Sequence, residues 1–110
     1  MGETLKLLRI FYGYKVKQLA EALEFSQSYV SELENNRKQP TMDVLERYSK
    51  FFNIKISTIF LFAEALESDH EIKDKKQKVA YAGMKLLTIL KKAGELDDEQ
   101  DISDRTKQII

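Results

Sequence analysis

Cysteine is absent from the 110-residue sequence, and proline and histidine occur once each. Without cysteine the chain has no disulfide framework and no thiolate metal site. A single proline among 43% apolar and 33% charged residues indicates one helical domain, or one such domain with an extension. We therefore expect an all-α fold.

Long apolar runs and a signal-like segment are absent too. The longest apolar stretches, residues 59–63 and 79–90, are broken by polar residues and fall short of the roughly 20 residues that span a membrane. Met1 to Leu8 does not resemble a signal peptide. We expect a soluble, cytoplasmic protein that has no membrane partner.

Patterns that support catalysis or metal binding are scarce. The sequence has no Gly-rich phosphate loop, and its one histidine is not near a serine or a carboxylate pair in a catalytic spacing. Asp97, Glu99 and Asp101 imitate the start of a calcium loop. Ile102 and Gln108, however, stand where that loop requires glycine and glutamate. We predict no enzyme activity, no cofactor and no metal site.

The charges are balanced in sum but unevenly distributed. Residues 1–66 carry nine basic and eight acidic groups (+1), residues 67–94 seven and four (+3), and residues 95–110 two and six (−4). Net charge therefore neither supports nor excludes a nucleic acid, and the positions of the charges must decide.

Apolar residues at helical spacing predict five short helices and a long sixth one. Ser68 and Glu71 form a capping-box pattern that should start the sixth helix, and Gly94 should end it. The acidic residues from Glu95 onwards predict a flexible, loosely held tail. The predicted helices span residues 4–12, 16–23, 27–35, 42–52, 56–66 and 69–93, and the predicted units are residues 1–66, 67–94 and 95–110.

The segment SQSYVSELENNRKQP, residues 26–40, is unusually polar for a helix in a core. Ser26 is a good N-cap, and only Val30 and Leu33 form an inward apolar face. The tight link from Glu24 to Ser26 joins this helix to the one before it. Two short helices connected in this way, the second polar on its outer face, describe a helix-turn-helix.

The run from Gly13 to Asn36, followed by Arg37, Pro40 and Thr41, resembles the Cro and lambda-repressor type of helix-turn-helix, often called Xre-like. The resemblance covers about residues 3–66 and leaves out the sixth helix and the tail. It implies a five-helix lambda-repressor-like domain whose helix over residues 27–35 lies in the DNA major groove. The residues that carry it include Leu19, Ala20, Leu23, Ser26, Val30, Leu33, Glu34 and Asn35.

The polar face of the third helix suits that role. Gln pairs with adenine, Ser meets either kind of base edge, and Glu accepts a hydrogen bond from the cytosine amino group. The resemblance places Gln27 and Ser28 at base-reading positions, with Ser31 and Glu32 one turn later. Tyr29 is expected to reach a thymine methyl group or a phosphate.

Positive and amide side chains are expected to hold the DNA backbone. The family usually has Thr and then Gln at Lys15 and Val16, and Val16 cannot make the phosphate contact of that Gln. Glu24 stands where the family favours Gly. The family also implies a structural ion pair between Arg9 and Glu34. The expected backbone contacts are Lys15, Lys17, Tyr29, Asn35, Asn36, Arg37 and Lys38.

The sixth predicted helix repeats apolar residues in steps of four and three from Val79 to Ala93, the spacing of a coiled-coil-like seam. In the first helix, positions that the family commonly keeps polar are apolar. We predict a two-fold dimer in which this seam contacts the first helix of both chains; folding back onto its own domain alone is the alternative. The predicted interface consists of Leu7, Ile10, Phe11, Val79, Gly83, Leu86 and Leu90.

Two functions remain open. The first is a sequence-specific DNA-binding transcriptional regulator, a bacterial or phage repressor that binds a palindromic operator in double-stranded DNA as a homodimer. The second is a protein-interaction module, such as an antitoxin-like partner binder with autoregulatory DNA binding. Its tail, which ends in Ile109 and Ile110, would bind the partner.

Overall fold

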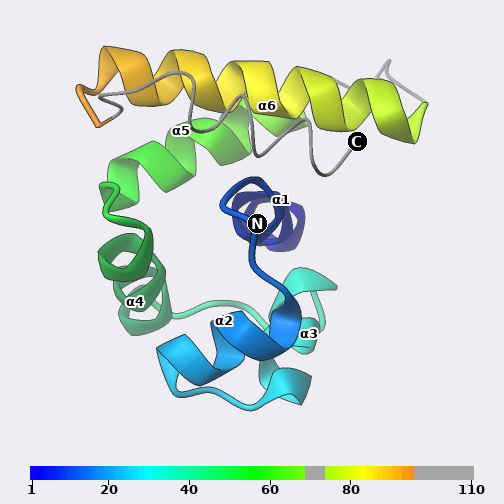
Figure 1. Ribbon diagram of the computed structural model, residues 1–110, viewed down its shortest axis with the longest axis vertical. Helices are drawn as coiled ribbons and strands as arrows, with labels where there is room; N and C mark the ends of the chain where they lie inside the picture. Colours follow the sequence, from blue (N-terminus) through cyan, green and yellow to red (C-terminus); the bar gives the residue numbers. More distant parts are fainter. Residues whose placement is uncertain (69–73, 96–110) are drawn as a thin grey trace.

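The computed structural model describes residues 1–68 and 74–95, and this part of the chain contains helices and no strand (Figure 1). The predicted all-α fold is confirmed. The second to fifth helices begin where the sequence predicts, and the first begins two residues earlier. The helices are α1 (Gly2–Phe11), α2 (Val16–Leu23), α3 (Gln27–Glu34), α4 (Met42–Phe52), α5 (Ile56–Glu67) and α6 (Lys75–Lys92).

The helix α1 lies at the centre, with α2 and α3 on one side and α5 and α6 on the other (Figure 1). Leu5, Leu8 and Phe11 of α1 are fully buried and recur in steps of three, which places them on one face of the helix. Leu33 from α3 and Phe62 from α5 are also fully buried in the same core. A single hydrophobic core therefore extends from the polar helix α3 through α1 to α5.

Two helices end at residues in the left-handed conformation. Glu24 (φ 61°) follows α2 and Asn53 (φ 56°) follows α4. The left-handed region costs an L-residue about 1 kcal/mol or more, although Asn tolerates it better than most. The conformation of Glu24 agrees with the glycine that the resemblance favours there, because the chain must turn sharply from α2 into α3.

The helix α6 packs along α5 and against α1 of the same chain (Figure 1). An ion pair of 2.8 Å joins Lys78 Nζ of α6 to Glu3 Oε1 of α1. Beyond the other end of α6, the Glu95 carboxylate accepts hydrogen bonds from the Lys55 N–H and the Thr58 hydroxyl. Glu95 thus caps the start of α5 and holds the end of α6 in place.

The predicted start of the sixth helix is wrong. Ser68 ends α5, where its hydroxyl donates a hydrogen bond to the carbonyl of Ala65 at 2.9 Å. The helix α6 begins at Lys75, and the Asp74 side chain accepts a hydrogen bond of 3.0 Å from the Lys76 N–H. Ser and Asp are both good caps, and the short-range pattern did not distinguish between them.

The residues predicted to hold two chains together lie largely inside one chain. Leu86 and Leu90 of α6 are fully buried, as is Phe11 of α1, and Leu7 is 5% exposed. Because these four side chains are buried in the core of the single chain, they leave little surface for a second chain. The helix α6 therefore packs on its own domain, which both the predicted dimer and the alternative require, and the dimer itself stays a prediction. Of the predicted set, Gly83 is also buried, and Ile10 and Val79 are half-buried.

Candidate nucleic-acid interface

The helix α3 begins at a well-formed cap. Ser26 has an extended backbone, and its hydroxyl accepts a hydrogen bond of 3.0 Å from the Tyr29 N–H. This cap leaves Gln27 and Ser28 exposed in the first turn of the helix. On the opposite face, Val30 and Leu33 are fully buried. The two-sided character that the sequence predicts for α3 is therefore present.

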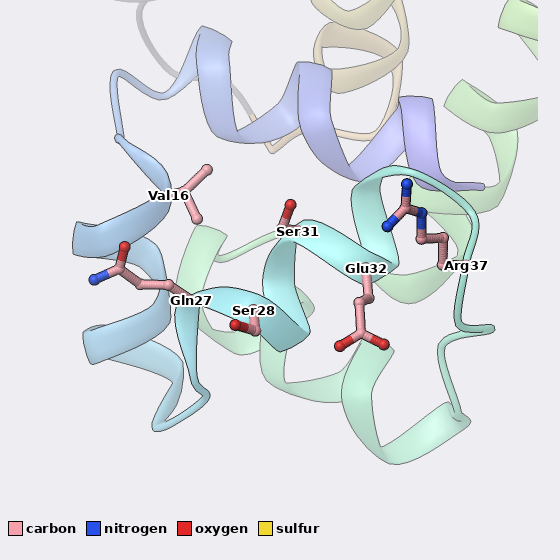
Figure 2. A pocket seen from close by; sticks show the side chains of 6 residues that line it. All are labelled: Val16, Gln27, Ser28, Ser31, Glu32 and Arg37. Carbon is pink, nitrogen blue, oxygen red and sulfur yellow. The ribbon is translucent and has the colours of Figure 1, made fainter.

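The four predicted base-reading residues line a single open cavity of about 560 Å³ (Figure 2). Figure 2 shows Gln27 on the side nearest α2 and Glu32 near the other end of α3. Val16 from the first turn of α2 and Arg37 from the segment after α3 complete the lining. The cavity therefore presents amide, hydroxyl, carboxylate and guanidinium groups together. Its lining residues are Val16, Gln27, Ser28, Ser31, Glu32 and Arg37.

The start of α2 borders this cavity. Lys15 and Lys17 are exposed on either side of Val16. The Lys15 N–H donates a hydrogen bond of 2.9 Å to Gln18 Oε1, so the Gln18 side chain satisfies one free amide at the helix start. The ammonium groups of Lys15 and Lys17 thus flank the position where the family's Gln is replaced by Val16, and their contact with DNA stays a prediction.

In the segment after α3, one of the polar residues predicted to contact DNA has a structural role instead. Asn36 has a left-handed backbone (φ 59°), and its Oδ1 accepts a hydrogen bond of 2.9 Å from the Gly2 N–H. No side chain fits at Gly2, where a Cβ would lie 2.6 Å from the carbonyl oxygens of Leu33 and Glu34. Asn36, predicted to contact the DNA backbone, therefore joins the end of α3 to the start of α1.

Three other predicted contacts, Asn35, Lys38 and Tyr29, also have partners within the chain. Asn35 Nδ2 donates a hydrogen bond of 2.9 Å to the carbonyl of Ser31, one turn back along α3. Lys38 Nζ lies 3.8 Å from Glu32 Oε2, an exposed ion pair worth less than about 1 kcal/mol. Tyr29 is half-buried, and its ring meets the Phe25 ring edge-on at 5.0 Å.

Arg9 and Glu34 form the ion pair that the resemblance implies. Arg9 Nε lies 2.7 Å from Glu34 Oε2, and Arg9 Nη2 lies 3.0 Å from Glu34 Oε1. Tyr48 is buried near this pair, and its hydroxyl has no hydrogen-bond partner among the described residues. Burial raises the pKa of Tyr48 above its ordinary value, and the negative charge of Glu34 raises it further.

Sequence reasoning missed Arg47, which supports the turn between α2 and α3. Its Nη1 donates a hydrogen bond of 3.0 Å to the carbonyl of Leu23, and its guanidinium lies 5.1 Å from the centre of the Phe25 ring. This contact satisfies a carbonyl at the end of α2 and anchors the connection to α3. Because 24 residues separate the two partners, no short-range pattern indicated it.

Comparison with known proteins agrees with this geometry. The sequence model of the family described as helix-turn-helix matches residues 5–59, half of the chain. The chain belongs to the helix-turn-helix family. The match includes α2, α3 and the connection between them, and the family is of the Cro and lambda-repressor type that the sequence resembles.

Two relatives of this helix-turn-helix chain are regulators by name. The competence pilus inhibition repressor of Acinetobacter baylyi is 35% identical over 69 residues, 63% of either chain. The HTH-type transcriptional regulator SinR of Bacillus subtilis is 26% identical over 85 residues, 76% of this chain and 77% of SinR. The chain thus spans less than two thirds of the competence repressor that it matches. No solved structure matches it significantly.

Other kinds of site find no support in residues 1–68 and 74–95. No helix there is long and apolar enough to cross a membrane. No three His, Cys, Asp or Glu side chains gather there in a way that would hold a metal ion. The calcium-like pattern from Asp97 and the tail expected to bind a partner protein lie outside the described residues, apart from Glu95.

Proposed function

We propose that this helix-turn-helix protein is a sequence-specific DNA-binding transcriptional regulator, a homodimeric repressor that reads the major groove with α3. The observation that carries the proposal is the single open cavity formed by Gln27, Ser28, Ser31 and Glu32. An α-helix with its side chains is about 10–12 Å in diameter, and the major groove is about 12 Å wide. The helix can therefore lie in the groove with its polar face against the base edges.

Each side chain in the cavity has a role that its chemistry permits. Gln27 can pair with adenine through its amide, and Glu32 can accept from a cytosine amino group. Glu32 must first leave Lys38, and this exposed pair separates at little cost. Lys38 is then free to meet a phosphate, so one rearrangement would supply both a base contact and a backbone contact.

Positive groups at both ends of the cavity would fix the position of the DNA. Lys15 and Lys17 lie at the start of α2, and Arg37 lies beyond the end of α3. All three are exposed, and no hydrogen bond or ion pair joins them through their side chains to another described residue. We assign them to phosphate contacts, which orient a protein on DNA without reading sequence.

The dimer in this proposal uses surface that the fold leaves exposed. Phe60 and Leu61 of α5 are 42% and 51% exposed, and Met84 of α6 is 69% exposed. Met84 borders a hollow of about 220 Å³ on the outer face of α6, together with Leu87, Thr88 and Lys91. Large apolar side chains exposed on one helix pair are typical of an association surface. We therefore propose the outer face of α6 as the contact with a second copy.

Selection of binding sites from random double-stranded DNA by the full chain tests the proposed function. We expect an enriched palindrome whose half-sites lie about one helical turn, roughly 34 Å, apart. The affinity for that site should exceed the affinity for random DNA by a factor of about 10³ or more at physiological salt. Equal affinity for the selected and random sequences would overturn sequence-specific regulation.

A further inference from the structure

A second cavity, of about 250 Å³, lies between α1, the end of α3 and the start of α6. We call it the α1–α6 cavity. Leu7, Ile10 and Val79 form its apolar wall, and Glu34 and Asn35 close it at the end of α3. Its volume is below the range of about 300–1,000 Å³ for drug-sized ligands, so it suits a small one.

The remaining lining residues of the α1–α6 cavity that the structure describes are charged. They are Glu3, Lys6, Lys75 and Lys78. The Glu3–Lys78 ion pair joins its two walls at 2.8 Å. Lys6 and Lys75 are exposed, and neither forms an ion pair or side-chain hydrogen bond with another described residue.

The carboxylate of Glu34 does not neutralise these lysines, because Arg9 already binds both of its oxygens. Glu3 likewise has Lys78 as its partner. Within the described lining, two positive charges, on Lys6 and Lys75, therefore remain beside an apolar wall. This combination of a small apolar space with uncompensated ammonium groups favours a ligand that is apolar at one end and negative at the other.

We propose that the α1–α6 cavity binds a small amphiphilic anion such as a medium-chain carboxylate. The apolar part of the ligand contacts Leu7, Ile10 and Val79, and its carboxylate meets Lys6 and Lys75. This inference goes beyond the proposed function and does not depend on it, since it concerns a different surface from the one lined by Gln27. A bound ligand would contact α1, the end of α3 and α6 at once, so it would stabilise their packing.

Three eight-carbon probes that differ only in their head group test the proposal on the full chain. Octanoate, 1-octanol and octylammonium would each be titrated while the backbone amide signals are followed by NMR. We expect octanoate to shift the amides of Leu7, Ile10, Asn35 and Val79, and to bind about tenfold more tightly than octylammonium. Octanol, which lacks charge, should bind with intermediate affinity.

Two neighbouring lysines provide a matched pair of variants. Lys75 lines the cavity, whereas Lys76 is exposed on the same turn and does not. We expect Lys75→Gln to weaken octanoate binding about threefold and Lys76→Gln to leave it unchanged. Neither substitution should alter octanol binding, because octanol carries no charge that a lysine could attract.

Two results would overturn the proposal, and both are obtained with the unmodified chain. The first is equal binding of all three probes, which would mean that the lysines select nothing. The second is a set of shifts centred on Phe60, Leu61 and Met84, which would place the probes on the exposed apolar surface of α5 and α6. Neither result depends on whether the chain binds DNA, so failure of this proposal would leave the proposed function unaffected.

Discussion

Arg9 donates two hydrogen bonds to the carboxylate of Glu34, and this contact joins α1 to the last residue of α3. The side chains are only 12% and 5% exposed, so the pair is largely shielded from water. Arg9 Nη1 also donates a hydrogen bond of 2.9 Å to the carbonyl of Tyr14. The orientation of α3 relative to the core therefore depends on a charged contact as well as on apolar packing.

Glu34→Ala should destabilise the fold by about 3 kcal/mol, because it leaves the Arg9 charge buried without its partner. The preference among DNA bases should change much less, since Glu34 does not line the cavity of Gln27. Denaturant unfolding and site selection would measure the two effects. Asp43→Ala is the control, because the exposed Asp43–Arg47 pair, at 3.8 Å, should be worth less than about 1 kcal/mol. An unchanged melting temperature in Glu34→Ala would contradict the structural role.

Tyr48→Phe should stabilise the protein by about 1 kcal/mol. The Tyr48 hydroxyl is buried and has no hydrogen-bond partner among the described residues, so its removal eliminates an unsatisfied polar group and keeps the ring packing. Chemical unfolding at neutral pH measures the change. Tyr81→Phe, at a half-buried position on α6, should have almost no effect. A loss of stability in Tyr48→Phe would show that the hydroxyl has a favourable partner.

The stability of the wild type should fall more steeply at alkaline pH than that of Tyr48→Phe. Burial and then Glu34 raise the pKa of folded Tyr48 above its ordinary value of about 10. As pH rises above about 10, the unfolded chain loses this proton while the folded chain keeps it, so the free energy of unfolding decreases. Unfolding measured at pH values on both sides of 10 tests this, and parallel curves for the two proteins would exclude it.

Gln27→Ala should weaken binding to the selected operator by about 1–3 kcal/mol and relax the preference at one base pair in each half-site. Arg37→Ala should instead weaken operator and random DNA alike, and should lower the salt dependence by about one unit of slope for each phosphate that the variant no longer binds. Affinities for operator and random DNA, measured over a series of salt concentrations, distinguish the effect of Gln27→Ala from that of Arg37→Ala. If Gln27→Ala weakened all sequences equally, its assignment as a base-reading residue would be wrong.

The sequence predicted the helix-turn-helix well because its signals are local. Ser26 caps α3 through a hydrogen bond that spans three residues, and Val30 and Leu33 mark the buried face within one turn. Two of the contacts that sequence reasoning missed are long-range ones. Glu95 caps a helix 40 residues earlier in the chain, and Arg47 binds a carbonyl 24 residues away. Neither contact has a spacing that a local pattern can indicate.

The apolar seam of α6 shows a second limit of prediction from sequence. The periodicity from Val79 to Leu90 identified the face that becomes buried, and Leu86 and Leu90 are indeed inaccessible. Burial of apolar surface is non-directional, however, so periodicity does not state whether the covering surface belongs to the same chain or to another. The single chain itself covers Leu86 and Leu90, and the outer face of α6 is the surface that we propose for a partner.

Met84→Glu should weaken the proposed dimer about tenfold or more, because it places an unpaired charge in the apolar contact between the outer faces of α6. Sedimentation equilibrium would measure the dissociation constant, and operator affinity should fall in parallel if two recognition helices act together. Gln77→Glu makes the same change in charge at an exposed position of α6 outside the hollow, and it should leave the dimer intact. Truncation after Leu66 is a poorer test, because it also removes Leu86 and Leu90 from the core of the domain. A Met84→Glu protein that dimerises as tightly as the wild type would exclude the outer face of α6 as the interface.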